Sequence, residues 1–195
     1  MNNLKLRESG MPAEDVWEQF FNPNDLFEKF DLQREKGLGA DIACGYGTFT
    51  IPLAKLLNTT IYAVDINAEF LTQVQKKAEE QKLANIITQN ADISDPDFKL
   101  PEKVQFALLF NILHCENPEL IVKNVKRNLT EEGRIYVIHW RTDIETPRGP
   151  PIEIRPTMDD IKILLTNVGF QMVKEFNSIE QYHYGIIFEL KEIDS

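Results

Sequence analysis

Predicted strands and helices alternate along most of this chain, and that alternation constrains the fold more than any other feature. Short apolar segments that are typical of strands occur at 39–43, 60–64, 85–90, 103–113 and 133–140. Segments with apolar residues at helical spacing lie between most of them, at 49–57, 67–83 and 118–129. Strands that alternate with helices in this way predict a parallel sheet with helices on both faces.

The last part of the chain departs from this alternation. Thr157 and Asp160 have the spacing of a helix cap, and Gly169 follows the last apolar position of that helix. Two strands follow at 170–176 and 184–190 without a helix between them, which predicts an antiparallel hairpin. The predicted fold class is α/β, a doubly wound, seven-stranded and mostly parallel sheet with a C-terminal antiparallel hairpin.

The glycine-rich stretch "DIACGYG", residues 41–47, directly follows the first predicted strand. Ligands of doubly wound sheets bind beyond the carboxyl ends of the strands, where the strand order reverses. Gly45 and Gly47 let the backbone pass close to a ligand, and the free N–H groups of the next helix face the same space. Two glycines by themselves are also compatible with an ordinary strand-to-helix turn.

Acidic residues end the next two predicted strands. Asp65 closes the second strand, where nucleotide-binding folds place a carboxylate that accepts both ribose hydroxyls. Asp92 follows the third strand, where a carboxylate can accept a hydrogen bond from an exocyclic amine. Each aspartate also fits a turn or a helix cap, but Asn67 is the better cap, which leaves Asp65 free for a ligand.

One position after the glycine turn indicates which class of nucleotide the turn can bind. A dinucleotide fingerprint requires G-x-G-x-x-G, and Thr50 stands where the third glycine belongs. The turn D-x-A-C-G-x-G, together with "LLFNILHCENP" and "LTEEGRIYVIHW" further along, resembles the motifs of small class I S-adenosylmethionine-dependent methyltransferases. The resemblance covers roughly residues 10–190 and implies a Rossmann-like fold with S-adenosylmethionine as the cofactor.

The first matched motif implies the residues around the methionine part of this cofactor. Asp41, Ala43, Gly45 and Gly47 are expected to form that part of the site. Cys44 lies in the same turn, where we expect a small and inert residue. Ala43 replaces the usual first glycine of the motif, a change that tightens the turn without blocking it.

The later motifs imply the residues around the nucleoside and the sulfonium. The resemblance places Asp65 on the ribose hydroxyls and Ile66 against the adenine ring. It places Asp92 on the adenine amine, with Ile93 beside it, and Asn111 near the sulfonium.

The resemblance also implies a single methyltransferase domain over residues 1–195. Its expected parts are an N-terminal helical lid at 1–36, a cofactor-binding core at 37–140, a proline-rich loop at 141–156, and a C-terminal helix and hairpin at 157–195. Trp17, Phe20 and Phe21 would line the lid, although burial against the core explains the same residues equally well. Loops as long as 141–156 inside a compact domain are usually functional or disordered.

The motifs do not reveal a catalytic residue, because methyl transfer from a sulfonium depends mainly on placing the nucleophile. His114 is a candidate proton acceptor at the mouth of the site, with a backbone-bonding role equally open. Tyr46, between the two glycines, is a candidate cover for the methyl group. His183 is a third candidate, against the packing role that aromatic residues of strands usually have. His139 is expected to pack in the core.

Composition disfavours several other classes of protein. The net charge of −10 disfavours nucleic acid as a partner, because phosphate neutralisation dominates such binding. The two cysteines, Cys44 and Cys115, and three scattered histidines give no metal-binding pattern. No apolar run is long enough to span a membrane, and the N-terminus lacks a secretory signal, so we expect a cytoplasmic protein without a membrane partner.

The sequence therefore predicts an enzyme that transfers a methyl group in line from S-adenosylmethionine to a small molecule. A protein side chain is the second choice of acceptor. Two alternatives belong to other classes: a regulatory protein that binds S-adenosylmethionine or a nucleotide without catalysis, and a nicotinamide-dependent oxidoreductase. Thr50 and the fourth-strand motif disfavour the oxidoreductase.

Overall fold

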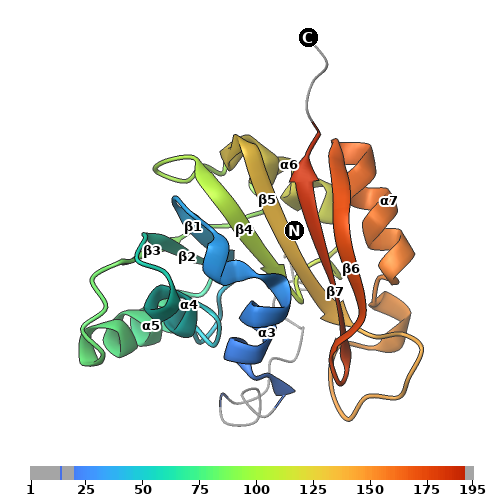
Figure 1. The fold of residues 1–195 in the computed structure, drawn as a ribbon, viewed down its shortest axis with the longest axis horizontal. Coiled ribbons are helices and arrows are strands. Elements are labelled where there is room, and N and C mark those ends of the chain that lie inside the picture. The colour runs from blue at the N-terminus through green and yellow to red at the C-terminus, as the bar shows by residue number, and fades with distance from the viewer. Residues whose placement is uncertain (1–13, 15–19, 192–195) are drawn as a thin grey trace.

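A computed structural model describes residue 14 and residues 20–191 of the chain. Seven strands form one sheet in the order β3-β2-β1-β4-β5-β7-β6 (Figure 1). The strands are β1 (Gly39–Ile42), β2 (Ile61–Asp65), β3 (Ile86–Asn90), β4 (Val104–Phe110), β5 (Leu129–Trp140), β6 (Phe170–Glu180) and β7 (His183–Leu190). Strands β1 to β5 pair in parallel, whereas β7 pairs antiparallel with both β5 and β6. The predicted fold class is confirmed.

Helices cover both faces of this sheet. The α-helices are α3 (Pro23–Phe30), α4 (Thr50–Leu56), α5 (Ala68–Glu80), α6 (Pro118–Asn128) and α7 (Met158–Val168), and two short 3-10 helices are η2 (Leu32–Arg34) and η3 (Ile152–Ile154). The α3, α4 and α5 helices pack on one face, and α6 and α7 pack on the other (Figure 1). The strand order reverses between β1 and β4, so the carboxyl ends of these strands mark the place where a ligand is expected.

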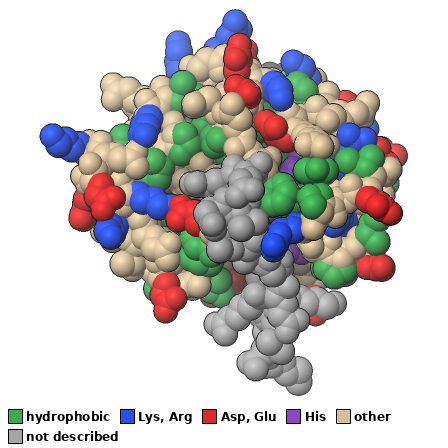
Figure 2. Space-filling view, turned by 90° about the horizontal axis from the view of Figure 1, so that it is seen from below, with side chains coloured by type: hydrophobic (Ala, Val, Ile, Leu, Met, Phe, Trp, Pro, Cys, Tyr) green, Lys and Arg blue, Asp and Glu red, His purple; other side chains and the backbone are tan. Residues whose placement is uncertain are grey.

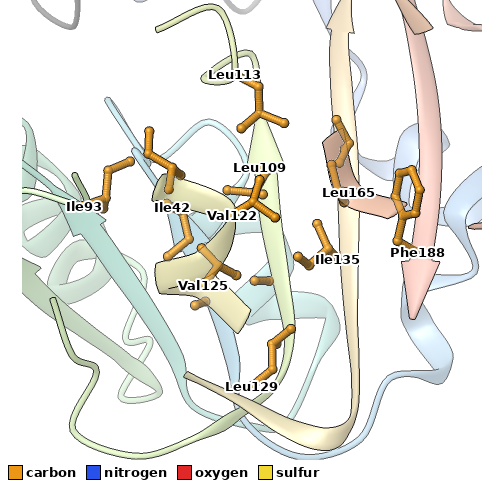
Figure 3. Close-up of a cluster of buried hydrophobic side chains, with 14 of the residues drawn as sticks. Ile42, Ile93, Leu109, Leu113, Val122, Val125, Leu129, Ile135, Leu165 and Phe188 are labelled. Atoms are coloured by element: carbon orange, nitrogen blue, oxygen red, sulfur yellow. The ribbon is translucent and has the colours of Figure 1, made fainter. Parts of the chain in front are cut away.

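The apolar core on the α6 and α7 face fixes these two helices against the sheet. Figure 3 shows Val122 and Val125 of α6 against Ile42 and Leu109, and Leu165 of α7 on the side of Phe188. Burying a side chain of this size stabilises a fold by about 1.5–3 kcal/mol. The strands at the centre of the sheet are therefore held from this face by a dense apolar layer.

The α3 helix lies within the segment expected to form the N-terminal lid, and it packs against the core. Asn22 caps α3 with its side chain, Pro23 starts the helix, and Leu26, Phe27 and Phe30 are buried in the core of the opposite face. Phe30 contacts Phe110 and Phe176, at ring distances of 6.0 and 5.5 Å. The α3 helix is thus part of the core, because its apolar stripe needs a partner. The segment with Trp17 lies outside the described residues.

Several element boundaries differ from those predicted, each for a backbone reason. The α5 helix ends at Glu80 and not near Leu83, because Lys82 takes a positive φ of 57°. The β4 strand ends at Phe110 and not at Leu113, because Asn111 also has a φ of 57° and turns the chain. The β5 strand begins at Leu129, four residues before Gly133, with a register shift against β4 near Phe106.

Candidate active site

The glycine turn between β1 and α4 is built from left-handed backbone conformations. Ala43, Gly45 and Gly47 have φ values of 61°, 52° and 78°. A residue with a Cβ costs about 1–2 kcal/mol in this region, so Ala43 holds strain that a glycine would not have. A Cβ at Gly47 would lie 2.9 Å from Val74 Cγ2, so this glycine also lets α5 pack closely on the turn.

Asp65 ties the end of β2 to this turn. Its Oδ2 accepts a hydrogen bond from the Gly45 amide at 2.9 Å, and its Oδ1 accepts one from the Asn67 amide at 2.8 Å. Asn67 caps α5, as predicted, by accepting a bond from the Glu69 amide. Asp65 is consequently not free in the sense expected, although each carboxylate oxygen keeps capacity for a second donor such as a ribose hydroxyl.

Asp41 is the second carboxylate of the turn. It is only 1% exposed, and its Oδ2 accepts a 2.6 Å hydrogen bond from the Thr50 hydroxyl. Burial, with a further contribution from the charge of Asp65, raises the pKa of Asp41 to about 6. Burial also raises the pKa of Asp65, although hydrogen bonds from the Asn67 and Gly45 amides oppose this. Thr50, which rules out the dinucleotide fingerprint, therefore has its own role in holding Asp41.

The two carboxylates give this edge of the sheet a negative potential. Within residues 20–191, neither Asp41 nor Asp65 forms an ion pair with a lysine or arginine. A group with a positive charge is therefore favoured near them, and an anionic pyrophosphate is disfavoured. S-adenosylmethionine carries a sulfonium, so its chemistry fits this donor set.

Two polar side chains near the turn are enclosed without a hydrogen-bond partner among the described residues. The amide nitrogen and oxygen of Asn111 and the hydroxyl of Thr48 all lack one. Buried polar atoms are nearly always hydrogen-bonded in a complete complex, so these atoms fit a bound ligand. Asn111 lies at the end of β4, as expected near the sulfonium. Thr48 was missed, and its only sequence signal is its place directly after Gly47.

The other two residues of the glycine turn pack against α5 and its neighbours. Cys44 is buried, and burial raises the pKa of its thiol, which suits the inert role expected. The ring of Tyr46 lies edge-on to Phe70 at 4.6 Å, so packing on α5 accounts for an aromatic residue between the glycines. Its carbonyl accepts a 2.8 Å hydrogen bond from Lys77, which also forms an ion pair with Glu14.

The three residues expected around the adenine differ in exposure and in hydrogen bonding. Asp92 Oδ1 accepts hydrogen bonds from the amide and the hydroxyl of Ser94, at 2.8 and 2.6 Å, so this aspartate does form a turn. Ile66 is 40% exposed at the end of β2, where an apolar residue is available to a ring. Ile93 is 5% exposed and belongs to the core on the α6 face, so it anchors the segment that carries Asp92.

The three histidines, scattered in the sequence, converge at the carboxyl ends of β4 and β5. The ring centroids of His114 and His139 are 5.4 Å apart, and the His139 ring is stacked on Tyr184 at 6.2 Å. His139 is fully buried, and neither of its ring nitrogens has a partner in the described part of the chain. Figure 2 views this edge of the sheet and shows histidine side chains close to the middle of the face.

His183 lies next to this pair but on the other face of the sheet. It is fully buried, with its ring 4.1 Å from Trp140 and 4.5 Å from Phe21. Phe20 packs edge-on against Trp140 at 5.6 Å. His183 therefore sits within an aromatic cluster, and burial lowers its pKa to about 3. This is the packing role, and it makes His183 the weaker of the two histidine candidates.

Arg155 anchors the proline-rich loop, 141–156, onto the sheet. Its guanidinium donates to the carbonyls of Pro150, Arg141 and Arg148 at 2.8, 3.1 and 3.3 Å, and lies 5.5 Å from the ring centre of Trp140. The loop is thus ordered by a cation that caps backbone oxygens. Its role as a functional loop stays a prediction.

No group of three histidine, cysteine, aspartate or glutamate residues among the described residues is arranged to hold a metal ion. No helix in residues 20–191 is long and apolar enough to cross a membrane.

Part of this chain matches a known family of protein domains. The family described as "Methyltransferase domain" matches residues 40–133, which include the glycine turn, Asp65, Asp92 and Asn111. A search of curated protein sequences gives no match.

Solved structures similar to this chain extend over nearly all of it. A S-adenosylmethionine-dependent methyltransferase from Aquifex aeolicus has a TM-score of 0.78 at 20% identity, covering 98% of this chain and 100% of that chain. A protein from Sulfolobus solfataricus assigned as a type 11 methyltransferase has a TM-score of 0.72 at 28% identity, covering 90% of this chain and 96% of that chain. Magnesium protoporphyrin IX methyltransferase from Synechocystis PCC 6803, with bound S-adenosylhomocysteine (SAH), has a TM-score of 0.66 at 16% identity, covering 96% of this chain and 93% of that chain. Residues 40–133 of this chain therefore match a methyltransferase domain, and the whole described chain has the fold of S-adenosylmethionine-dependent methyltransferases.

Proposed function

We propose that this enzyme transfers a methyl group in line to a small molecule held at the carboxyl ends of β4 and β5. The observation that carries the proposal is the enclosed, unpartnered amide of Asn111. Asn111 follows β4, which lies between β1 with its carboxylate and β5 with His139. A ligand that satisfies this amide would lie between the two sides of the site.

Each residue of the cofactor site has a proposed task. Asp65 accepts from the ribose hydroxyls, Asp92 accepts from the adenine amine, and Ile66 packs on the adenine. The negative potential of Asp41 and Asp65 favours the positively charged cofactor over its neutral thioether product. When bound, S-adenosylmethionine supplies a methyl group on a sulfonium, which is a good leaving group.

The acceptor is proposed to be a small molecule, with a protein side chain as the second choice. In this proposal the loop 141–156, held by Arg155, and the aromatic cluster of Phe20, Trp140 and His183 border the acceptor at the β5 end. Two structures of similar fold are named for comparably small acceptors: a glycopeptide N-methyltransferase and the magnesium protoporphyrin IX methyltransferase. We also propose a cytoplasmic enzyme and a single domain with the core, loop and C-terminal parts given above, in which α3 packs in the core.

A label-transfer experiment tests this function. The full chain is incubated with S-adenosylmethionine carrying a tritiated methyl group and with a metabolite extract, and the small-molecule and protein fractions are counted separately. Label is expected in the small-molecule fraction with the wild type and not with the Asp65→Ala variant.

Three other outcomes would change the proposal. Label in the protein fraction alone would identify a protein acceptor. Binding of S-adenosylmethionine without label in either fraction would favour the non-catalytic alternative. Binding of NADH in place of S-adenosylmethionine would contradict the cofactor assignment.

A further inference from the structure

Two imidazole side chains lie close together at the β5 end of the site. His114 is half-buried after β4, and its Nδ1 is enclosed with no hydrogen-bond partner in residues 20–191. The His139 ring lies beside it, at an interplanar angle of 76°, with both nitrogens also enclosed and unpartnered. A ring nitrogen without a hydrogen-bond donor beside it keeps its lone pair available, so each imidazole can accept a proton.

The surroundings keep both imidazoles neutral. Burial lowers the pKa of His114, and the charge of Arg155 lowers it further. Burial lowers the pKa of His139 well below its ordinary value. A neutral imidazole is the form that accepts a proton, so both rings are in the required state near neutral pH.

Arg155, the cation that acts on both rings within residues 20–191, has its hydrogen bonds committed elsewhere. The Nε, Nη1 and Nη2 atoms of Arg155 all donate to backbone carbonyls of the loop. Arg141 forms a two-bond ion pair with Asp143, at 2.9 and 2.7 Å. The guanidinium groups of Arg141 and Arg155 are thus engaged, whereas the enclosed ring nitrogens of His114 and His139 have no hydrogen-bond partner in the described chain.

We propose that the methyl acceptor is a molecule with an O–H or N–H group and that His114 accepts its proton, with His139 as a positioning residue. This inference rests on the proposed function, since it names the class of acceptor for the same reaction. It excludes an acceptor that is already anionic, such as a carboxylate, and one that has no proton to lose, such as a thioether.

The atoms balance in this step. The electron pair of the acceptor oxygen or nitrogen forms the new bond to the methyl carbon, and the bond between that carbon and sulfur breaks with its pair left on sulfur. The O–H or N–H bond breaks, its pair stays on the acceptor, and the proton goes to a ring nitrogen of His114. The imidazolium then loses this proton to water.

His139 packs against His114 and helps to hold its ring in position. Its ring is stacked on Tyr184, whose hydroxyl donates to the Pro156 carbonyl at 2.9 Å at the end of the proline-rich loop. A ring held in this way keeps His114 from turning into the core. Because it is fully buried, we expect it to act only through His114.

The test identifies the methylated atom and then the base. The full chain is incubated with S-adenosylmethionine carrying a ¹³C-labelled methyl group and a metabolite extract, and the carbon chemical shift of the product identifies the bonded atom. A methyl group on a hydroxyl oxygen or on nitrogen is expected. The His114→Ala variant should then lose about 100-fold or more in turnover, the usual contribution of a general base, and added imidazole should restore part of it.

The control is Tyr62→Phe, which removes a hydroxyl that donates to Glu102 at the opposite edge of the sheet and should keep wild-type turnover. A readout that does not depend on activity is the NMR titration of the histidine rings with S-adenosylhomocysteine bound. The His114 ring should titrate below its ordinary pKa of about 6.5, as a partly exposed ring can. His139→Gln should lower turnover less than His114→Ala does and should change the His114 titration.

The outcomes separate the two proposals. Methylation of a carboxylate, a thioether or carbon would overturn this inference and leave the proposed function standing. Unchanged turnover in a folded His114→Ala or His114→Gln variant, or a His114 ring that takes up no proton in the titration, would also overturn it. If the wild type methylates nothing, the proposed function fails, and the inference fails with it.

Discussion

The two sides of the active site use opposite electrostatic arrangements. The β1 side holds Asp41 and Asp65, two buried carboxylates without a cationic partner in the described chain. The β5 side holds His114 and His139, two neutral imidazoles beside an arginine that is already bonded to carbonyls. Negative charge suits a cationic cofactor, and a neutral base suits an acceptor that must lose a proton.

The two sides also differ in how they are built. The β1 side comes from short turns at the ends of adjacent strands, and hydrogen bonds such as Gly45 to Asp65 fix its geometry. The β5 side comes from a loop after β4, the end of β5, the start of β7 and the proline-rich loop. The cofactor side is thus set by local backbone geometry, and the acceptor side by tertiary packing.

The largest effect is expected from Asp65→Ala on the β1 side. The variant should bind S-adenosylmethionine about 1,000-fold more weakly, because two hydrogen bonds to a charged group are each worth about 1.5–3 kcal/mol. Isothermal titration calorimetry measures this. Asp65→Asn, which keeps one acceptor for the Gly45 turn, is the control and should fall between wild type and Asp65→Ala. Unchanged affinity in the alanine variant would refute the ribose role.

A smaller effect is expected from Asp41→Asn, as a gain in stability. The folded pKa of Asp41 is about 6 against 3.8 for the unconstrained group. The native state therefore holds its proton more tightly than the unfolded state, and the stability this gives at low pH is lost as pH rises through 6. Replacing the carboxylate should raise the free energy of unfolding at pH 8 by up to about 3 kcal/mol, and by less at pH 5.

The same Asp41→Asn variant should lose part of its preference for S-adenosylmethionine over S-adenosylhomocysteine, by up to about tenfold. Urea unfolding at pH 5 and 8 and calorimetry with both ligands measure the two effects. A variant that is less stable at pH 8 than the wild type would show that the charge of Asp41 is compensated within the protein.

The smallest effect at neutral pH is expected on the β5 side, from His183→Phe. The pKa of His183 is about 3 in the folded protein, far below the usual value of 6.5. The unfolded chain therefore takes up a proton below pH 6.5 that the native state refuses, so stability falls as pH falls from 6.5 toward 3. Removing the imidazole should lessen this loss by about 1.4 kcal/mol for each pH unit below about 6.

Urea unfolding of both proteins between pH 4 and 7 measures that difference in slope. His139, with the same direction of shift, and Asp41, with the opposite one, titrate in both proteins and cancel in the comparison. Parallel stability curves for the two proteins would mean that His183 is protonated in the native state.

Much of the fold was predictable because its signals are local. Strand β1, the Asn67 cap and the Thr157–Asp160 capping box each depend on residues a few positions apart. The cofactor side followed for the same reason, since Asp41, Gly45 and Asp65 end or follow neighbouring strands. The resemblance implied an N-terminal lid at 1–36 and left burial against the core equally open, because an apolar stripe indicates burial without identifying the surface that covers it.

The acceptor side was not predictable, because the sequence does not contain the order of the last strands. The β7 strand inserts between β5 and β6, which sets Trp140 opposite His183 and His139 opposite Tyr184. Histidines 25 and 44 residues apart (114 to 139, and 139 to 183) thus reach one edge of the sheet. The usable signal was that all three stand at predicted strand ends.

The sequence by itself determined the class of fold and the family resemblance, and it predicted the cofactor side, because strand–helix alternation and short turns are encoded by neighbouring residues. Only the tertiary structure decided which side chains share the acceptor side, that Arg155 is committed to the loop, and that α3 belongs to the core. The physical reason is that burial and the absence of hydrogen-bond partners, which make His114 and His139 candidates for chemistry, are properties of surroundings assembled from distant parts of the chain.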